Sequence, residues 1–286
     1  MTAPGPNLSI SREYHAAALV VRGRTLAWGE RTYIMGIINV TPDSFSGDGT
    51  HGDIARAVAL ARQFEAEGAD LLDIGGESSR PGAAPLDGAE ECRRVVPAIK
   101  AVRAVTELPL SIDTYHASVA AAALDAGADF VNDISGLRYD SAMAGVVAHA
   151  GVPLVAMHNQ RGRKFHDVIG DIADGLTATL CLADKVGIDR ANVILDPGFG
   201  FGWTVEHNLE MLRRLPELWT LDLPLLLGVS RKSTIGAVLG APVEARSEGT
   251  AAAVALAIAA GADIVRVHDV HAMRQVARMA DAVVRS

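Results

Sequence analysis

The 286-residue sequence has little cysteine, few aromatic residues and no excess of positive charge. Cys92 and Cys181 have no CxxC or paired spacing, which favours reduced thiols and a cytoplasmic location over a disulfide. A net charge of −8 argues against a general nucleic-acid surface, because phosphate binding needs concentrated Lys and Arg. The most apolar run, at 251–260, is too short to span a bilayer and predicts a buried helix. The N-terminus has no continuous apolar region of the kind found in a signal peptide. Because the net charge is negative, any anion-binding site must be formed locally by a few basic side chains.

The residues that are abundant are Ala, Val, Ile, Leu and Gly, arranged in a repeating plan. At 67–77, 126–136 and 260–270 a helical segment ends at Gly, and Ala-Asp, an apolar run and polar residues follow. Proline precedes similar apolar runs at 107–114, 150–159 and 222–232. With the runs at 33–41 and 191–198, the sequence predicts about eight buried strands. Segments of helical length lie between them, for example 53–67, 115–126 and 269–284.

This alternation predicts a closed (β/α)8 barrel spanning residues 33–286 as one domain. An open doubly wound sheet is the alternative, but no GxGxxG follows the first strand. Residues 1–32 stand outside the alternation. We expect them to form an extension whose hairpin caps the lower mouth of the barrel, with the first few residues disordered.

Polar side chains follow every predicted strand, where a βα barrel places its active site. Each has a structural alternative when taken alone. An Asp after a strand also caps turns, and His158 is also typical of a buried core histidine. The complete set favours a ligand site, and its members are Asn39, Glu77, Asp113, Asn132 with Asp133, His158, Asp196, Arg231 with Lys232, and Arg266 with His268.

Arg266 and His268 are two residues apart on a strand, so their side chains project to the same side. No sequence-adjacent acid faces Arg266, and a buried guanidinium needs a charge partner, which indicates an anionic ligand. The segment 228–236, with Gly, Ser, Arg, Lys and Ser together, follows the seventh strand at the usual phosphate site of such barrels. The Gly- and Pro-rich segment 75–85 is typical of a mobile substrate-covering loop.

In combination, the motifs of the chain from about residue 33 to its end resemble the dihydropteroate synthase family, which sulfonamides inhibit. They read MGIINVTPDSFS, DIGGESSRPGA, SIDT, VNDISG, ILDPGFGFG, GVSRKS and IVRVHDV, in this order. The resemblance implies a (β/α)8 barrel, usually dimeric. It also implies a transferase of folate biosynthesis that joins 6-hydroxymethyl-7,8-dihydropterin diphosphate to 4-aminobenzoate, with 7,8-dihydropteroate and diphosphate as products.

The resemblance also implies roles for individual residues. The pterin pocket falls on Asp113, Asn132, Asp196 and Lys232. The diphosphate site falls on Asn39, Arg266 and His268, and Mg²⁺ would be held by the amide oxygen of Asn39 and by phosphate oxygens. Diphosphate would leave before the arylamine attacks, so no protein nucleophile is implied. The aminobenzoate pocket and its loops match Ser78, Ser79, Arg80, Phe201 and Ser233.

Two loops depart from the family pattern and leave alternatives open. FSGDGT moves an acid to Asp48, and MHNQRGR leaves the roles of His158 and Arg161 open. A methyltetrahydrofolate methyltransferase would share the pterin contacts but would not need a diphosphate site. A non-catalytic or specialised pterin-binding paralogue is the other alternative, and the retained Asn39, Arg266 and His268 speak against it.

Overall fold

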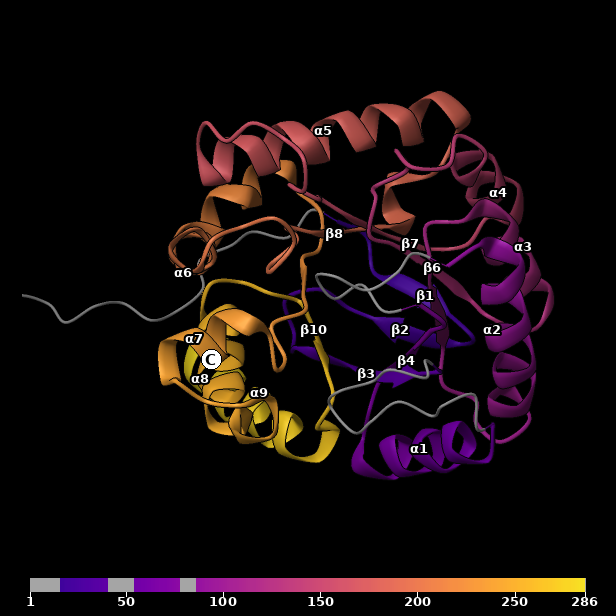
Figure 1. Cartoon of the computed structure of the whole chain (residues 1–286), viewed down its shortest axis with the longest axis horizontal. Helices are drawn as coiled ribbons and strands as arrows, with labels where there is room; N and C mark the ends of the chain where they lie inside the picture. The colour runs from indigo at the N-terminus through magenta and orange to yellow at the C-terminus, as the bar shows by residue number, and fades with distance from the viewer. Residues whose placement is uncertain (1–15, 41–53, 78–85, 286) are drawn as a thin grey trace, which may run out of the picture.

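The computed structural model describes residues 16–40, 54–77 and 86–285. Its main sheet has eight parallel strands in the order β8-β7-β6-β5-β4-β3-β10-β9. An isolated parallel bridge between Leu195 and Leu225 brings the two outer strands together. The predicted (β/α)8 barrel is confirmed (Figure 1), and its strands are β3 (Tyr33–Asn39), β4 (Leu71–Gly75), β5 (Leu110–Asp113), β6 (Phe130–Asp133), β7 (Leu154–Met157), β8 (Val193–Asp196), β9 (Leu226–Leu227) and β10 (Ile264–Val267).

Helices surround the barrel and follow the strands in turn (Figure 1). Gly68, Gly127 and Gly261 have φ values of 89°, 112° and 90°, which confirms the predicted left-handed glycines between helix and strand. The helices are α1 (Ile54–Glu67), α2 (Gly88–Arg103), α3 (Ala117–Asp125), α4 (Met143–Ala150), α5 (Val168–Val186), α6 (Val205–Arg214), α7 (Ser233–Leu239), α8 (Ser247–Ala259) and α9 (Val270–Val284), with short 3-10 turns at Arg190–Asn192, Leu215–Leu221 and Val243–Ala245.

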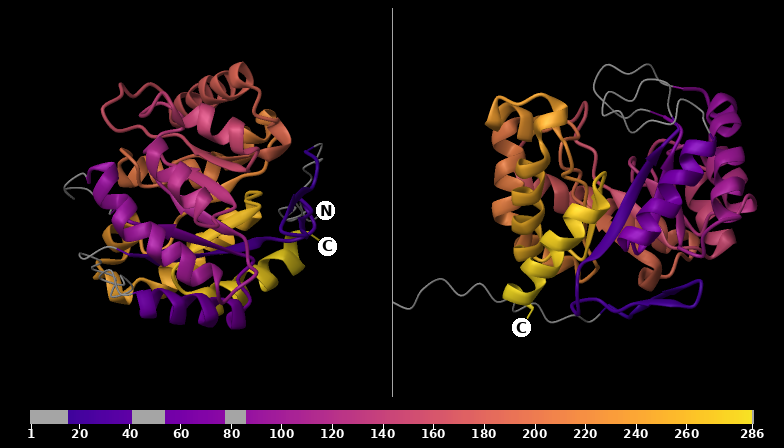
Figure 2. Two further views of the ribbon diagram at one scale, coloured as in Figure 1. Left: turned by 90° about the vertical axis from the view of Figure 1, so that its right-hand side faces the viewer. Right: turned by 90° about the horizontal axis from the view of Figure 1, so that it is seen from below.

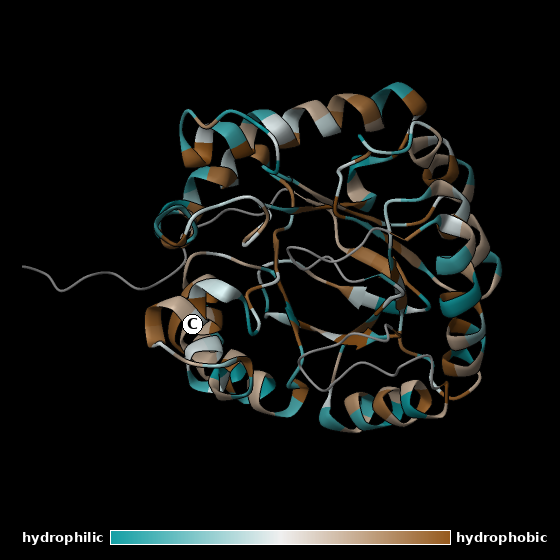
Figure 3. Ribbon diagram, in the orientation of Figure 1, coloured by the Kyte–Doolittle hydropathy of each residue, from teal (hydrophilic) through white to brown (hydrophobic). Residues whose placement is uncertain are grey.

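The strands are buried on both faces, as expected for parallel strands covered by helices. In Figure 3 the strands are mostly hydrophobic, whereas hydrophobic and hydrophilic segments alternate along most helices. The largest apolar cluster lies between the sheet and the helices. None of the helices in the described part of the chain combines the length and hydropathy that crossing a bilayer requires.

A short hairpin covers the amino end of the barrel (Figure 2, right). Its strands, β1 (Leu19–Val21) and β2 (Arg24–Leu26), pair in antiparallel fashion. Leu19 and Leu26 pack in one buried cluster with Phe130 and Ile194 from the barrel strands. This arrangement confirms the predicted cap. The division of the chain into domains at residue 32 stays a prediction, and the expected disorder of the first residues concerns positions outside the described ranges.

Candidate active site

Four of the predicted site residues lie at or next to the carboxyl ends of their strands. Asn39, Asp113 and Asp196 end β3, β5 and β8, and Asn132 lies in β6. Gly75 ends β4 between two of them, and a Cβ placed on it would lie 3.7 Å from Asn39 Oδ1 and 3.8 Å from Asp113 Oδ2. The amide and the carboxylate therefore lie beside the same glycine at one end of the barrel.

Arg266 in β10 is held by two carboxylates. Its Nε donates to Asp73 Oδ2 at 2.5 Å, and its Nη2 donates to Asp113 Oδ2 at 2.7 Å. The charge partner that a buried guanidinium needs is therefore supplied by two acids that are not adjacent to Arg266 in sequence. The partners lie 193 and 153 residues away in sequence, and closure of the barrel brings them to the guanidinium. A phosphate is thus not required to explain the position of Arg266, although the remaining N–H groups of a guanidinium are phosphate donors.

Asp73 is the site residue that the sequence reading missed. It is fully buried in β4, and its Oδ2 also accepts a hydrogen bond from Asn132 Nδ2 at 3.1 Å. One carboxylate thus orients both a guanidinium and an amide. Asp73 is not among the polar groups at the strand ends, because it lies two residues before the end of β4. The sequence feature that could have identified Asp73 is an acidic residue in the middle of the otherwise apolar run LLDIG.

Asp196 and Lys232 form the opposite-charge part of the site. Burial raises the pKa of Asp196 to about 6, against a lowering by the Gly198 backbone N–H and by Lys232. Burial also lowers the pKa of Lys232 to about 8, and the positive charge of Arg266 lowers it further. Lys232 Nζ lies 4.2 Å from the centre of the Phe201 ring, so the ammonium contacts an aromatic face.

Burial likewise raises the pKa of Asp113, and nearby Arg266 partly offsets the rise. Asp113 and Asp196 are therefore carboxyl groups that a ligand with N–H donors would stabilise in their charged form. Lys232 is the complementary donor, because the negative charges of both acids raise the pKa of its ammonium and so favour its charged form.

The loops after β9 and β10 are joined by polar contacts. His268 Nδ1 and Ser230 Oγ lie 2.9 Å apart, and Arg231 Nη2 donates to Asp269 at 2.9 Å and 3.0 Å. Ser233 begins α7 directly after Lys232. The predicted phosphate region therefore has a serine that orients His268, and Arg231 is tied to Asp269.

Two other strand-end residues have structural contacts. His158 is fully buried, with its Nε2 2.9 Å from Gln160 Oε1, and burial lowers its pKa to about 4. Asp133 accepts hydrogen bonds from the backbone N–H groups of Ser135 and Leu137. A neutral core histidine and a turn-capping aspartate account for these positions. The predictions for Asp48, Ser78, Ser79 and Arg80 concern residues outside the described ranges.

A parallel barrel that gathers acids, an amide and cations at its carboxyl end is an enzyme architecture. Residues 35–268 match the family model described as Pterin binding enzyme. The chain is 47% identical over 90% of its length to a dihydropteroate synthase of Clostridium beijerinckii, covering 96% of it. It is also 45% identical to that of Bacillus subtilis, with 90% of each chain covered. The chain therefore belongs to the dihydropteroate synthase family, as its motifs predicted.

Solved structures agree with this assignment. The dihydropteroate synthase of Clostridium difficile, determined in the presence of pteroic acid, has a TM-score of 0.85 at 48% identity, with 91% of this chain and 99% of that chain covered. The dihydropteroate synthase of Xanthomonas albilineans with 4-aminobenzoic acid has a TM-score of 0.87 at 43% identity, with 93% of this chain and 97% of that chain covered. A sulfonamide complex of the Yersinia pestis enzyme has a TM-score of 0.87 at 38% identity, with 93% of this chain and 98% of that chain covered.

Proposed function

We propose that this protein condenses 6-hydroxymethyl-7,8-dihydropterin diphosphate with 4-aminobenzoate, giving 7,8-dihydropteroate and diphosphate. The observation that carries the proposal is the placement of buried Asp196 and half-buried Lys232 at the same barrel end as Arg266 with its two carboxylates. Membership of the family and the ligands named for the similar structures support it.

The pterin ring is recognised by groups of matching hydrogen-bonding character. Asp113 and Asp196 accept from the N–H donors of the amino-pyrimidinone edge, while Asn132 and Lys232 donate to its acceptors. Asp73 acts as a positioning residue, because its Oδ2 binds both Asn132 and Arg266. The acids, the amide and the ammonium thus bind a flat heterocycle that itself carries both hydrogen-bond donors and acceptors.

The bond between the pterin methylene carbon and the diphosphate oxygen breaks first, and its electron pair leaves with the diphosphate. The amine of 4-aminobenzoate then bonds to the methylene carbon and loses one proton. Arg266 and His268 stabilise the charge that develops on the leaving group. Ser230 holds the His268 ring in place for this role.

Asn39 fits the proposed Mg²⁺, because its carboxamide oxygen is a hard donor and magnesium commonly takes few protein ligands together with waters and substrate phosphates. The side chain is half-buried at the end of β3, and its Oδ1 lies beside Gly75, which has no side chain to obstruct it. When bound, the ion would neutralise charge on the diphosphate.

The 4-aminobenzoate site is proposed around Phe201 and Ser233, with Ser78, Ser79 and Arg80 as its loop residues. Phe201 is 7% exposed and contacts Lys232, so an aromatic wall adjoins the proposed pterin pocket. Sulfonamides would compete for the same place, as the drug complex of the Yersinia pestis relative suggests by analogy.

The test is diphosphate release with both substrates, combined with growth rescue of a synthase-deficient strain. Wild type should release diphosphate only when both substrates are present, and it should restore growth. Arg266→Ala and Asp196→Ala should fail in both assays while keeping a folded barrel by circular dichroism. Methyl transfer without diphosphate release would reject the proposed reaction, and wild-type behaviour of both variants would reject the site.

A homodimer is the proposed assembly, and a reducing cytoplasm is the proposed location. Apolar side chains are exposed on α7 and α8, which contact each other: Val238 is 56%, Leu239 53% and Leu256 60% exposed. Such a patch is typical of a subunit contact. Cys92 and Cys181 are both free thiols, in keeping with a reducing compartment. Leu256→Glu should convert the dimer into monomers in light scattering, and a monomeric wild type would reject the dimer.

A further inference from the structure

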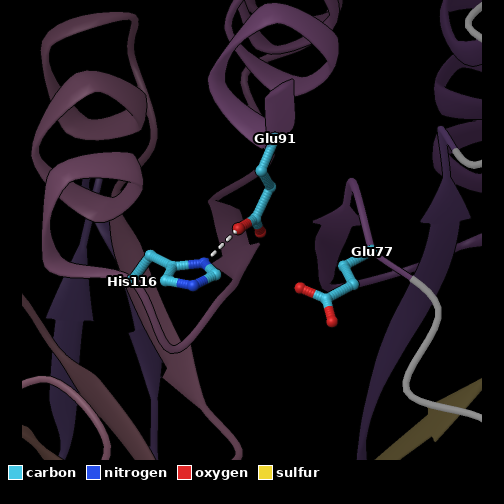
Figure 4. Close-up of side chains that lie close together, drawn as sticks. All are labelled: Glu77, Glu91 and His116. Atoms are coloured by element: carbon cyan, nitrogen blue, oxygen red, sulfur yellow. Dashed lines mark hydrogen bonds and ion pairs between the residues drawn. The ribbon is translucent and has the colours of Figure 1, made fainter. Parts of the chain in front are cut away.

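A second polar cluster lies beside the end of β4, and the proposed reaction does not use it (Figure 4). Glu77 follows β4, Glu91 lies in the first turn of α2, and His116 precedes α3. One potential ligand atom from each of the three lies within 4.8 Å of the other two. Figure 4 shows the three side chains pointing toward a common space from three different segments.

Each carboxylate in this cluster has one satisfied and one unsatisfied oxygen. Glu77 Oε1 accepts from the Tyr115 hydroxyl at 2.6 Å, and Glu91 Oε2 lies 2.8 Å from His116 Nδ1. Within the described ranges, Glu77 Oε2 and Glu91 Oε1 are buried and have no hydrogen-bond partner. Glu91 is only 1% exposed, so bulk water does not solvate its second oxygen.

A buried carboxylate oxygen without a donor is costly, so the cluster needs a compensating group. A shared proton requires oxygens about 2.6 Å apart, and the described contacts include no hydrogen bond between Glu77 and Glu91. A bound cation instead separates its ligands by about 3 to 4 Å, since each metal–ligand distance is about 2.1 Å. The three potential ligand atoms lie within 4.8 Å of one another, a spread that a bound cation could draw together, and a cation would also compensate the two buried oxygens that have no donor.

The donor types narrow the class of cation. Mg²⁺ and Ca²⁺ prefer oxygen ligands alone, whereas an imidazole nitrogen with two carboxylates is a donor set for zinc and related ions. We propose that Glu77, Glu91 and His116 bind a divalent transition-metal ion of the zinc class. The ion would tie the end of β4 to the starts of α2 and α3. This site is distinct from the one proposed at Asn39 and does not depend on the proposed reaction.

The test is a calorimetric titration of Zn²⁺ into the full-length, chelator-treated protein, with Mg²⁺ present to saturate other oxygen sites. One Zn²⁺ per chain should bind to the wild type. Glu91→Gln, which preserves side-chain size, and His116→Ala should each weaken binding at least tenfold. Glu90→Gln is the matched control, because Glu90 is the neighbouring residue but pairs with Arg93 and Arg94. It should bind as wild type does.

Thermal unfolding supplies a second readout that is independent of activity. Zn²⁺ should raise the unfolding temperature of the wild type and of Glu90→Gln, because binding to the native state stabilises it. It should not raise that of His116→Ala, which removes a partly exposed side chain and keeps the test available if Glu91→Gln folds poorly. Absence of saturable binding, or equal affinity in the wild type and both cluster variants, would overturn the proposal.

Discussion

The amino and carboxyl ends of the barrel differ in the side chains that they bury. At the amino end, Leu19, Leu26, Phe130 and Ile194 form an apolar plug beneath the strands. At the carboxyl end, Asp73, with no exposed surface, and Arg266, with its side chain 19% exposed, form an ion pair. Burial of apolar surface stabilises the fold, whereas burial of charges costs desolvation that their pairing only offsets. The apolar plug therefore adds stability at the amino end, whereas the proposed chemistry lies at the carboxyl end.

Arg266→Ala should have the largest effect on activity and would sharpen this contrast. It removes the proposed donor to the leaving group and leaves Asp73 and Asp113 without their cation. We expect diphosphate release to fall about 10³-fold, measured as kcat/KM for the pterin diphosphate. Arg266→Lys keeps the charge but loses the two-point contact, and it should recover only part of the activity. Full activity of Arg266→Ala would contradict the assignment.

Phe130→Ala should affect stability alone, because it acts at the other end. The ring is fully buried in the plug, and its removal should cost about 3 to 5 kcal/mol of unfolding free energy in urea titration. The kcat of the protein that remains folded should be unchanged. Phe165→Ala, whose ring is 49% exposed, is the matched control and should cost much less. A lower kcat in Phe130→Ala would show that the two ends are coupled.

Asn208→Ala should have a smaller effect, confined to one substrate. This buried amide accepts from Gly200 N at 2.7 Å and donates to Thr234 Oγ1 at 3.0 Å. It thereby joins the segment before Phe201 to the one after Ser233. We expect the KM for 4-aminobenzoate to rise about tenfold, equivalent to about 1.4 kcal/mol, with little change in the KM for the pterin diphosphate.

Asn208→Asp separates the acceptor contact of this residue from its donor contacts, which include one from Nδ2 to the Thr204 carbonyl oxygen at 2.8 Å. The aspartate keeps the acceptor for Gly200 N but has no amide to donate to Thr234, so an intermediate KM is expected. Equal increases in the KM values of both substrates would indicate a general loss of structure rather than positioning of the aminobenzoate pocket.

The smallest expected effect is a pH dependence from Asp196. Its pKa is raised to about 6, so lowering the pH below 6 should protonate it and weaken pterin binding. kcat/KM should therefore fall several-fold between pH 7 and pH 5. Stability should change in the other direction: the native state holds this proton more tightly than the unfolded state, so the contribution of Asp196 falls as pH rises from about 4 to 6.

Asp196→Asn tests both effects, because it removes the titration while keeping the side-chain shape. Its unfolding free energy, measured across the same pH range, should vary less than that of the wild type. An unchanged acid limb in the kcat/KM profile of a residually active Asp196→Asn would assign that limb to another group.

The ends of the strands were predictable because they are set by residues that are neighbours in the sequence. An apolar run bounded by Gly-Ala-Asp or by proline predicts a buried parallel strand, and the carboxyl ends of such strands meet at one edge. Asn39, Asp113, Asp196 and Arg266 were placed in this way. Asp73 was missed by the same reasoning, since its role is visible only across the barrel.

The sequence by itself determined the alternation of strands and helices, the N-terminal hairpin and the family motifs, because each depends on residues close together in the chain. Only the tertiary structure decided which charges are partners. Arg266 pairs with Asp73 across 193 residues, and Arg231 pairs with Asp269 across 38. Ion pairing depends on distance in space and on burial, and closure of the barrel sets both.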